Sequence, residues 1–231
     1  MSFATNSVGD ALAQLSQAVE FRCQAENLPA DVHVVRTPVA LVFVRGDRAE
    51  PGASLARQIV ASFGYWNLES AKYLDLVFFG WWKDGDTVGF QGHDNARIFI
   101  ECYEEVQRLS KWRYSGETDI LLVDFEMPVM AGGKLEHGVF SFRNCIYLPI
   151  EEMIADKRIR SLDALVYELV AEARVVFDRD PLQGTAFDVS DRIAWTRGRR
   201  ALWDRLKTLF LRDWSKVYDE LRPFSVCNLS V

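Results

Sequence analysis

VALVFV, at residues 39–44, is the stretch of sequence that decides the fold. All six residues are apolar, so both faces of a strand formed by them would be apolar. This is typical of a strand that is buried on both faces of a sheet. LDLVFF at residues 74–79 has the same character, and TDILLVDF at residues 118–125 is a third run of this kind. We therefore predict three buried strands at these positions.

The segments between these strands have helical periodicity. The first predicted helix spans residues 51–64 and places four apolar residues on one face: Leu55, Ile59, Val60 and Phe63. The second spans residues 94–109 and begins with Asp94 as its N-cap. Strands that alternate with helices are typical of a parallel sheet with right-handed crossovers, so we expect the three strands to be parallel neighbours.

A fourth strand is predicted at residues 139–148, where apolar and polar side chains alternate. Only residues 126–138 separate it from the third strand, which is too short for a helical crossover. We therefore expect it to be an antiparallel edge strand.

The other elements are helices. One precedes the sheet at residues 7–26, another begins after Ser161, and two more follow that are separated near Gly198. The predicted fold is α/β, with a short, mostly parallel sheet flanked by helices and a helical C-terminal third. We assign residues 1–180 to an α/β domain with its N-terminal helix, and residues 181–231 to a C-terminal helical extension packed on it.

Composition indicates a globular chain without a membrane span. Of the 231 residues, 49% are hydrophobic, which is enough to bury a core without disulfides or structural zinc. No apolar run approaches the roughly 20 residues that a spanning helix needs, and no signal peptide is visible. The cysteines (Cys23, Cys102, Cys145 and Cys227) form no CxxC pair, and we interpret them as free thiols in a cytoplasmic protein.

The net charge of −6 is unevenly distributed along the chain. Residues 190–222 contain nine Lys or Arg and five Asp or Glu, whereas the remaining residues are strongly acidic. Arg197, Arg199 and Arg200 therefore make nucleic-acid binding by the C-terminal helices one hypothesis. The competing interpretation is an amphipathic helix whose basic face is solvated.

Polar side chains gather where the predicted strands end. In a parallel sheet, ligands bind outside the carboxyl ends of the strands. Arg45 and Asp47 follow the first strand, Glu126 follows the third, and three candidates follow the second: Trp82, Asp84 and Asp86. These residues would meet at one ligand site, or they are solvated loop charges.

His93 directly precedes a predicted helix, and Asp94 begins it. The free amides at the start of a helix favour an anion such as a phosphate. His93, Asp94 and Asp84 are therefore the catalytic candidates, and a divalent metal would be needed only if the protein is an enzyme of this kind. Ser115 lies in a turn with Trp112 and Tyr114, before the third strand, and we expect it at the opposite end of the sheet.

The sequence carries no family motif that we recognise. It contains no GxGxxG, no Walker A loop, no HExxH and no HxE with PCxxC. The first hypothesis is a non-catalytic or weakly catalytic subunit of a larger assembly in a bacterial multi-gene system, with a protein partner or a second copy. The alternatives are a small α/β enzyme that acts on a nucleotide or another phosphorylated ligand, and a nucleic-acid-binding protein. Whether it is an enzyme stays open.

Overall fold

The computed structural model describes residues 1–26, 31–45, 52–70, 72–84, 87–90 and 92–208, and their side chains except at 25, 26, 52–54, 87, 92, 93 and 198–208. Within these residues, the centre is a five-stranded sheet with the order β1-β3-β2-β6-β7. The strands are β1 (Ser2–Thr5), β2 (Val34–Phe43), β3 (Asp75–Phe79), β6 (Asp119–Pro128) and β7 (Val139–Pro149). A separate hairpin, β4 (Trp82–Asp84) and β5 (Thr87–Gly89), follows β3.

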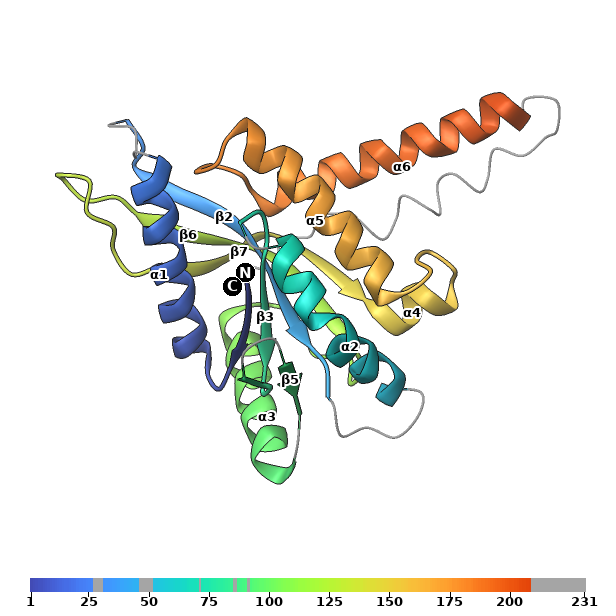
Figure 1. Cartoon of the computed structure of the whole chain (residues 1–231), viewed down its shortest axis with the longest axis horizontal. Coiled ribbons are helices and arrows are strands. Elements are labelled where there is room, and N and C mark those ends of the chain that lie inside the picture. The colour runs from blue at the N-terminus through green and yellow to red at the C-terminus, as the bar shows by residue number, and fades with distance from the viewer. Residues whose placement is uncertain (27–30, 46–51, 71, 85–86, 91, 209–231) are drawn as a thin grey trace.

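Helices cover both faces of the sheet, as Figure 1 shows. The helices are α1 (Val8–Glu26), α2 (Gly52–Ser70), α3 (Gly92–Leu109), α4 (Ile150–Ala155), α5 (Leu162–Arg179) and α6 (Ala186–Thr208). Val39, Leu41 and Phe43 of β2 pack with α1 and α3, whereas Ala40 and Val42 pack with α2 and α5. The prediction that β2 is buried on both faces is confirmed, and the molecule is a mixed α/β fold.

The expected parallel arrangement of the three central strands is wrong. β2 is parallel to β3, and β3 is parallel to the short strand β1, which the sequence reading missed. β6 runs antiparallel to β2, with Phe43 opposite Asp119. The antiparallel pairing of β7 with β6 is confirmed.

The end point of α3 determines the direction of β6. A crossover helix would carry the chain back to the opposite end of the sheet, and α3 does not do so. Residues after α3 pack against the end of β2: the ring of Trp112 lies 4.5 Å from that of Phe43, centroid to centroid. The chain is thereby held at the end of the sheet where β2 and β3 finish. β6 must therefore start at that end and run back.

Two helix predictions are confirmed and three need correction. Ser161 caps α5, since its Oγ accepts a hydrogen bond from Ala164 N at 3.2 Å. Residues 8–26 form the expected first helix. The two helices expected to be separated near Gly198 are one continuous helix, α6. Val60 is exposed on α2 and does not share the buried face of Leu55, Ile59 and Phe63.

The third correction concerns Asp94, which we expected to be the N-cap of its helix. The helix α3 begins at Gly92, so Asp94 lies within its first turn. An acidic residue there is still favourable, because it faces the positive end of the helix dipole.

The helix α6 begins against a buried carboxylate of the sheet. Ala186 N donates a hydrogen bond of 2.6 Å to Asp124 Oδ1, and Asp124 is 3% exposed. Thr185 and Asp188 complete a capping box, in which each side chain accepts from the other residue's backbone amide. Ala186 and Ile193 join the core formed with α2 and α5. The division of the chain after residue 180 stays a prediction.

Three of the four cysteines lie in the described part of the chain. Cys23, Cys102 and Cys145 are buried thiols outside any disulfide, whereas Cys227 lies outside the described residues. Over the described part of the chain, none of the helices combines the length and the apolar character needed to cross a membrane.

Candidate functional site

The predicted ligand site at the sheet end is described only in part. Arg45 follows β2 and is half-buried, while Asp84 and Trp82 are exposed on β4. Asp47 and Asp86 lie outside the described residues, as does the side chain of His93. Glu126 lies at the opposite end of the sheet, because β6 is antiparallel, and its carboxylate pairs with Arg36 at 3.1 Å. The expected convergence with Glu126 is therefore wrong.

The hairpin that carries Trp82 and Asp84 is attached beside β1. Lys83 Nζ donates a hydrogen bond of 3.0 Å to Ser2 O, which anchors β4 to the first strand. The indole ring of Trp82 lies against Gly89 of β5, where a Cβ atom would clash with it. These contacts give Trp82 a structural role within the hairpin.

Aromatic rings occupy the space where the parallel strands end. Phe43 stacks on Phe79 with ring centroids 5.0 Å apart. Phe99 of α3 lies 6.5 Å from Phe43, and Trp112 closes the cluster from the other side. Trp81 seals the end of β2, since its Nε1 donates to Val44 O at 3.0 Å. A ligand at this end of the sheet would compete with a packed aromatic core.

Gly80 brings α3 directly onto the end of β3. Its φ of +74° is in the region that favours glycine, and Asn95 Nδ2 donates to Gly80 O at 2.6 Å. A Cβ on Gly80 would lie 2.8 Å from Phe99 Cβ. The first turns of α3 are therefore packed against protein at this point.

A buried carboxylate that sequence reasoning missed also lies at this end. Asp119 opens β6 and accepts hydrogen bonds from Ser115 N at 2.9 Å, Ser115 Oγ at 2.8 Å and Tyr147 OH at 3.1 Å. Burial raises the pKa of Asp119, and the bonds from Ser115 and Tyr147 oppose that rise. Ser115 was expected at the opposite end of the sheet and is corrected here, because β6 starts beside the end of β2.

The hydrogen bonds of the Asp119 cluster close a turn. Ser115 Oγ also accepts from Glu117 N at 3.0 Å, which is the pattern of a local turn. The turn reading of residues 111–117 therefore accounts for these contacts. In the sequence, the four-residue spacing of Ser115 and Asp119 on either side of Gly116 could have indicated this turn.

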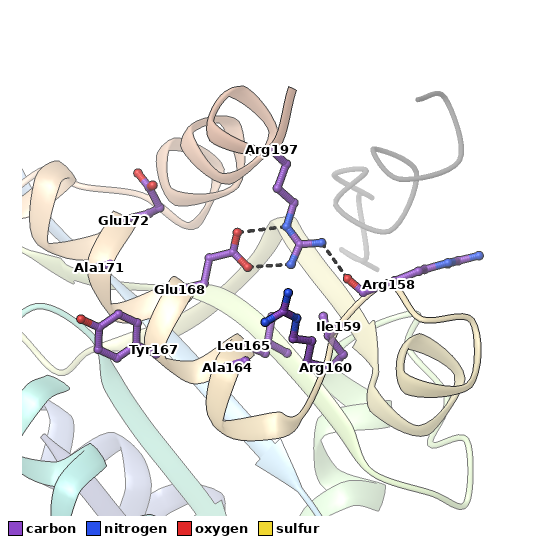
Figure 2. A pocket seen from close by; sticks show the side chains of 10 residues that line it. All are labelled: Arg158, Ile159, Arg160, Ala164, Leu165, Tyr167, Glu168, Ala171, Glu172 and Arg197. Carbon is purple, nitrogen blue, oxygen red and sulfur yellow. Dashed lines mark hydrogen bonds and ion pairs between the residues drawn. The ribbon is translucent and has the colours of Figure 1, made fainter. Parts of the chain in front are cut away.

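A pocket of about 440 Å³ lies between α5, α6 and the loop after α4 (Figure 2). Apolar residues such as Ile159 and Leu165 line it together with charged ones. Arg197 forms a two-pronged ion pair with Glu168, through Nε at 3.0 Å and Nη2 at 2.6 Å. Its Nη1 donates to Arg158 O at 3.2 Å. These bonds tie α6 to α5.

The charges around this pocket are mostly paired within the protein. Arg192 Nε bonds Glu172 at 2.8 Å, and Arg158 pairs with Asp156 at 2.9 Å. Figure 2 shows Arg160 directed towards the Arg197–Glu168 pair. Among the described residues, Arg160 has no acidic partner. The guanidinium of Arg197 is already engaged, whereas the side chains of Arg199 and Arg200 lie outside the description.

The outer face of α2 is an exposed surface of a different kind. No charged residue occurs from Gln58 to Leu68, although part of this helix faces solvent. The exposed fractions are 47% for Val60, 51% for Tyr65 and 74% for Leu68. We call Val60, Ala61, Gly64, Tyr65 and Leu68 the α2 face. Solvated helix faces are normally charged or polar, so the α2 face is unusual.

Metal chemistry and known relatives give no further guide to the site. Within the described residues, no group of three or more His, Cys, Asp or Glu side chains is arranged to hold a metal ion. In comparisons with family models, curated proteins and solved structures, none matches this chain. The geometry of the molecule is therefore the basis for the function proposed below.

Proposed function

We propose that this protein is a non-catalytic subunit of a larger assembly and that the α2 face is its contact surface. The observation that carries this proposal is the uncharged, exposed stretch from Gln58 to Leu68. The core of a protein interface is depleted of charge and enriched in aromatic residues, and contiguous apolar surface marks such interfaces. The α2 face has both features.

The surface continues from α2 onto α5. Tyr167 is 59% exposed, and α5 packs against α2. Desolvation raises the pKa of Tyr65, and the charges of Glu69 and Tyr167 add to the rise. Tyrosine is favoured at interfaces because it adds a large contact area with few rotatable bonds and carries a hydrogen-bonding tip. The pair thus extends the apolar face with groups suited to a protein partner.

The two other functions proposed from the sequence have less support. A small-molecule site at the sheet end would lie where Phe43, Phe99 and Trp112 are packed together. Nucleic-acid binding through the C-terminal helices would draw on Arg197, which is held by Glu168 and by Arg158 O. The sheet end is thus filled by packed rings, and Arg197 already has structural partners.

The test compares two matched double variants of the full chain. Tyr65→Glu with Leu68→Glu places two charges on the α2 face. Ile100→Glu with Leu109→Glu makes the same change on α3, where both residues are also exposed. The tagged proteins are isolated from the cells that naturally express them, and their complexes are weighed by native mass spectrometry.

We expect wild type and the α3 variant to retain the same assembly and the α2 variant to lose it. Circular dichroism verifies that all three proteins are folded. If the α2 variant keeps the wild-type assembly, or if wild type is isolated as a monomer, the proposed function is wrong.

A further inference from the structure

We propose that the pocket between α5, α6 and the loop after α4 binds a small organic carboxylate with an apolar body, and that Arg160 holds the carboxylate. This inference goes beyond the proposed function and can be tested without the native assembly. Three features of the pocket support it: the balance of charges around it, its volume, and the apolar residues that line it.

The carboxylates that line the pocket are already bound by side chains of α6. Arg197 holds Glu168 through two hydrogen bonds, of 3.0 Å and 2.6 Å. Glu172 accepts from Arg192 Nε at 2.8 Å and from Thr196 Oγ1 at 2.8 Å. Each of the two carboxylates thus has a counter-charge within the protein, so neither is left over to neutralise a further cation.

Arg160 adds a positive charge to this balanced group. Within the part of the chain that the structure describes, no carboxylate pairs with it, whereas Arg158 in the same loop pairs with Asp156 at 2.9 Å. Figure 2 shows the guanidinium of Arg160 directed towards the pair of Arg197 and Glu168. The complement of a guanidinium in this position is an anion. A carboxylate is the best match in shape, because it accepts two parallel hydrogen bonds from the planar fork.

The charge balance also favours a carboxylate over a phosphate ester. A carboxylate carries one negative charge, which Arg160 alone offsets. A phosphate monoester carries close to two negative charges at neutral pH. Its second charge would lie near Glu168, whose own counter-charge is already used. The pocket therefore suits an anion with a single charge.

The rest of the pocket suits an apolar body attached to that carboxylate. Its volume of about 440 Å³ lies within the range of about 300–1,000 Å³ that small-molecule sites occupy. Ile159, Ala164 and Leu165 line it close to Arg160, as Figure 2 shows. Ile159 and Leu165 also belong to the packed core, so their positions are fixed before a ligand arrives. Apolar walls with a few charged groups that orient the ligand are typical of such sites.

The test is isothermal titration calorimetry of the purified full chain with octanoate, in which one carboxylate ends a short apolar chain. We expect the wild type to bind octanoate with a Kd on the order of 0.1 mM, which is within reach of a ligand of this size. Octan-1-ol has the same chain length without the charge, and we expect its Kd to be about tenfold higher or more. Octyl phosphate carries the additional charge and should also bind more weakly than octanoate.

Two pairs of matched variants locate the site. Arg160→Gln removes the guanidinium and should raise the octanoate Kd about tenfold. Arg174→Gln removes an exposed guanidinium that does not line the pocket, and should leave the Kd unchanged. Ala164→Phe places a ring in the pocket and should abolish binding, whereas Val175→Phe places the same ring on another part of α5 and should not affect it. All four residues are exposed, and circular dichroism verifies that the variants are folded.

Several outcomes would overturn the proposal. The site is refuted if the wild type does not bind octanoate at concentrations up to about 5 mM, or if Arg160→Gln or Ala164→Phe binds it as the wild type does. Equal affinity for octan-1-ol would show that the charge has no role. Tighter binding of octyl phosphate would refute the choice of a carboxylate. These results do not depend on the assembly that native mass spectrometry measures, so the two proposals can fail separately.

Discussion

Protonation of Asp124 should make the stability of this protein depend on pH in the acidic range. The carboxylate is buried beneath the start of α6 and accepts its hydrogen bond from Ala186 N. Burial raises the pKa of Asp124 from 3.8 to about 6, although the bond from Ala186 and the charge of Arg36 oppose the rise. Glu126 and Asp188 add to it.

The size and sign of the effect follow from proton linkage. A difference of about two pKa units between the folded and unfolded protein corresponds to about 3 kcal/mol. The folded protein binds the proton more tightly, so the contribution to stability is fully present below pH 3.8 and is lost as the pH rises through about 6. At neutral pH the folded protein carries the cost of a buried charge.

The variants Asp124→Asn and Asp124→Ala separate the charge from the hydrogen bond. Asparagine can still accept from Ala186 N without a charge, so Asp124→Asn should be more stable than wild type at neutral pH by up to about 3 kcal/mol. Asp124→Ala leaves the buried amide of Ala186 without its acceptor and should lose about 1–3 kcal/mol relative to Asp124→Asn at every pH.

Urea denaturation at a series of pH values between about 4 and 7 measures these differences as free energies of unfolding. The matched control is Asp178→Asn on α5, whose exposed carboxylate pairs with Arg174 at 3.8 Å. The control should follow the wild-type pH dependence within about 0.5 kcal/mol. If the free-energy difference between wild type and Asp124→Asn is the same at both ends of the pH range, Asp124 does not titrate as argued and the reasoning is refuted.

Two further predictions concern the sheet. Gly80→Ala should lower the free energy of unfolding by more than 2 kcal/mol, because it combines a positive φ with a Cβ that meets Phe99, whereas Gly116→Ala, with φ of +87° and open space, should cost about 1 kcal/mol. Equal costs in thermal denaturation would show that the close packing of α3 on β3 is incorrect. Asp75→Asn should cost about 3–5 kcal/mol, since this buried carboxylate pairs with Arg22 and with the amine of Met1 at 2.9 Å. The exposed pair of Arg97 and Glu101 provides the control, and Glu101→Gln should change stability by less than about 0.5 kcal/mol in the same assay.

The positions of the central strands could be predicted from the sequence, but their directions could not. An apolar run that is buried on both faces has the same pattern whichever way it runs, as residues 39–44 and 118–125 show. Direction depends on where the connecting segment ends. Here it is fixed by the packing of Trp112 on Phe43, a contact between residues far apart in the sequence. Helical periodicity in residues 94–109 gave no information about that contact.

The candidate site was inferred from an architecture that assumes an open sheet end. Arg45 and Asp84 follow strands as expected, but the segments around them also contain Trp81, Phe90 and Phe99. In the structure these rings contact one another, with centroids of Phe90 5.7 Å from Trp81 and 6.2 Å from Phe99. The aromatic content of these loops was a visible sign that the sheet end is filled. The partners of the rings could not be assigned without coordinates.

The error at Val60 shows how the α2 face could have been found. We placed Val60 with Ile59 and Phe63 because all three are apolar, but adjacent residues on a helix point about 100° apart. Ile59 and Phe63 face the sheet, and Val60 faces outward with Tyr65 and Leu68. A helix with two apolar faces needs two sets of contacts, whereas a search for one apolar stripe finds only the face against the core. The eleven residues from Gln58 to Leu68 without a charge are the signal that the second face exists. The sheet is the partner of the first face, and the second face is the contact surface proposed above.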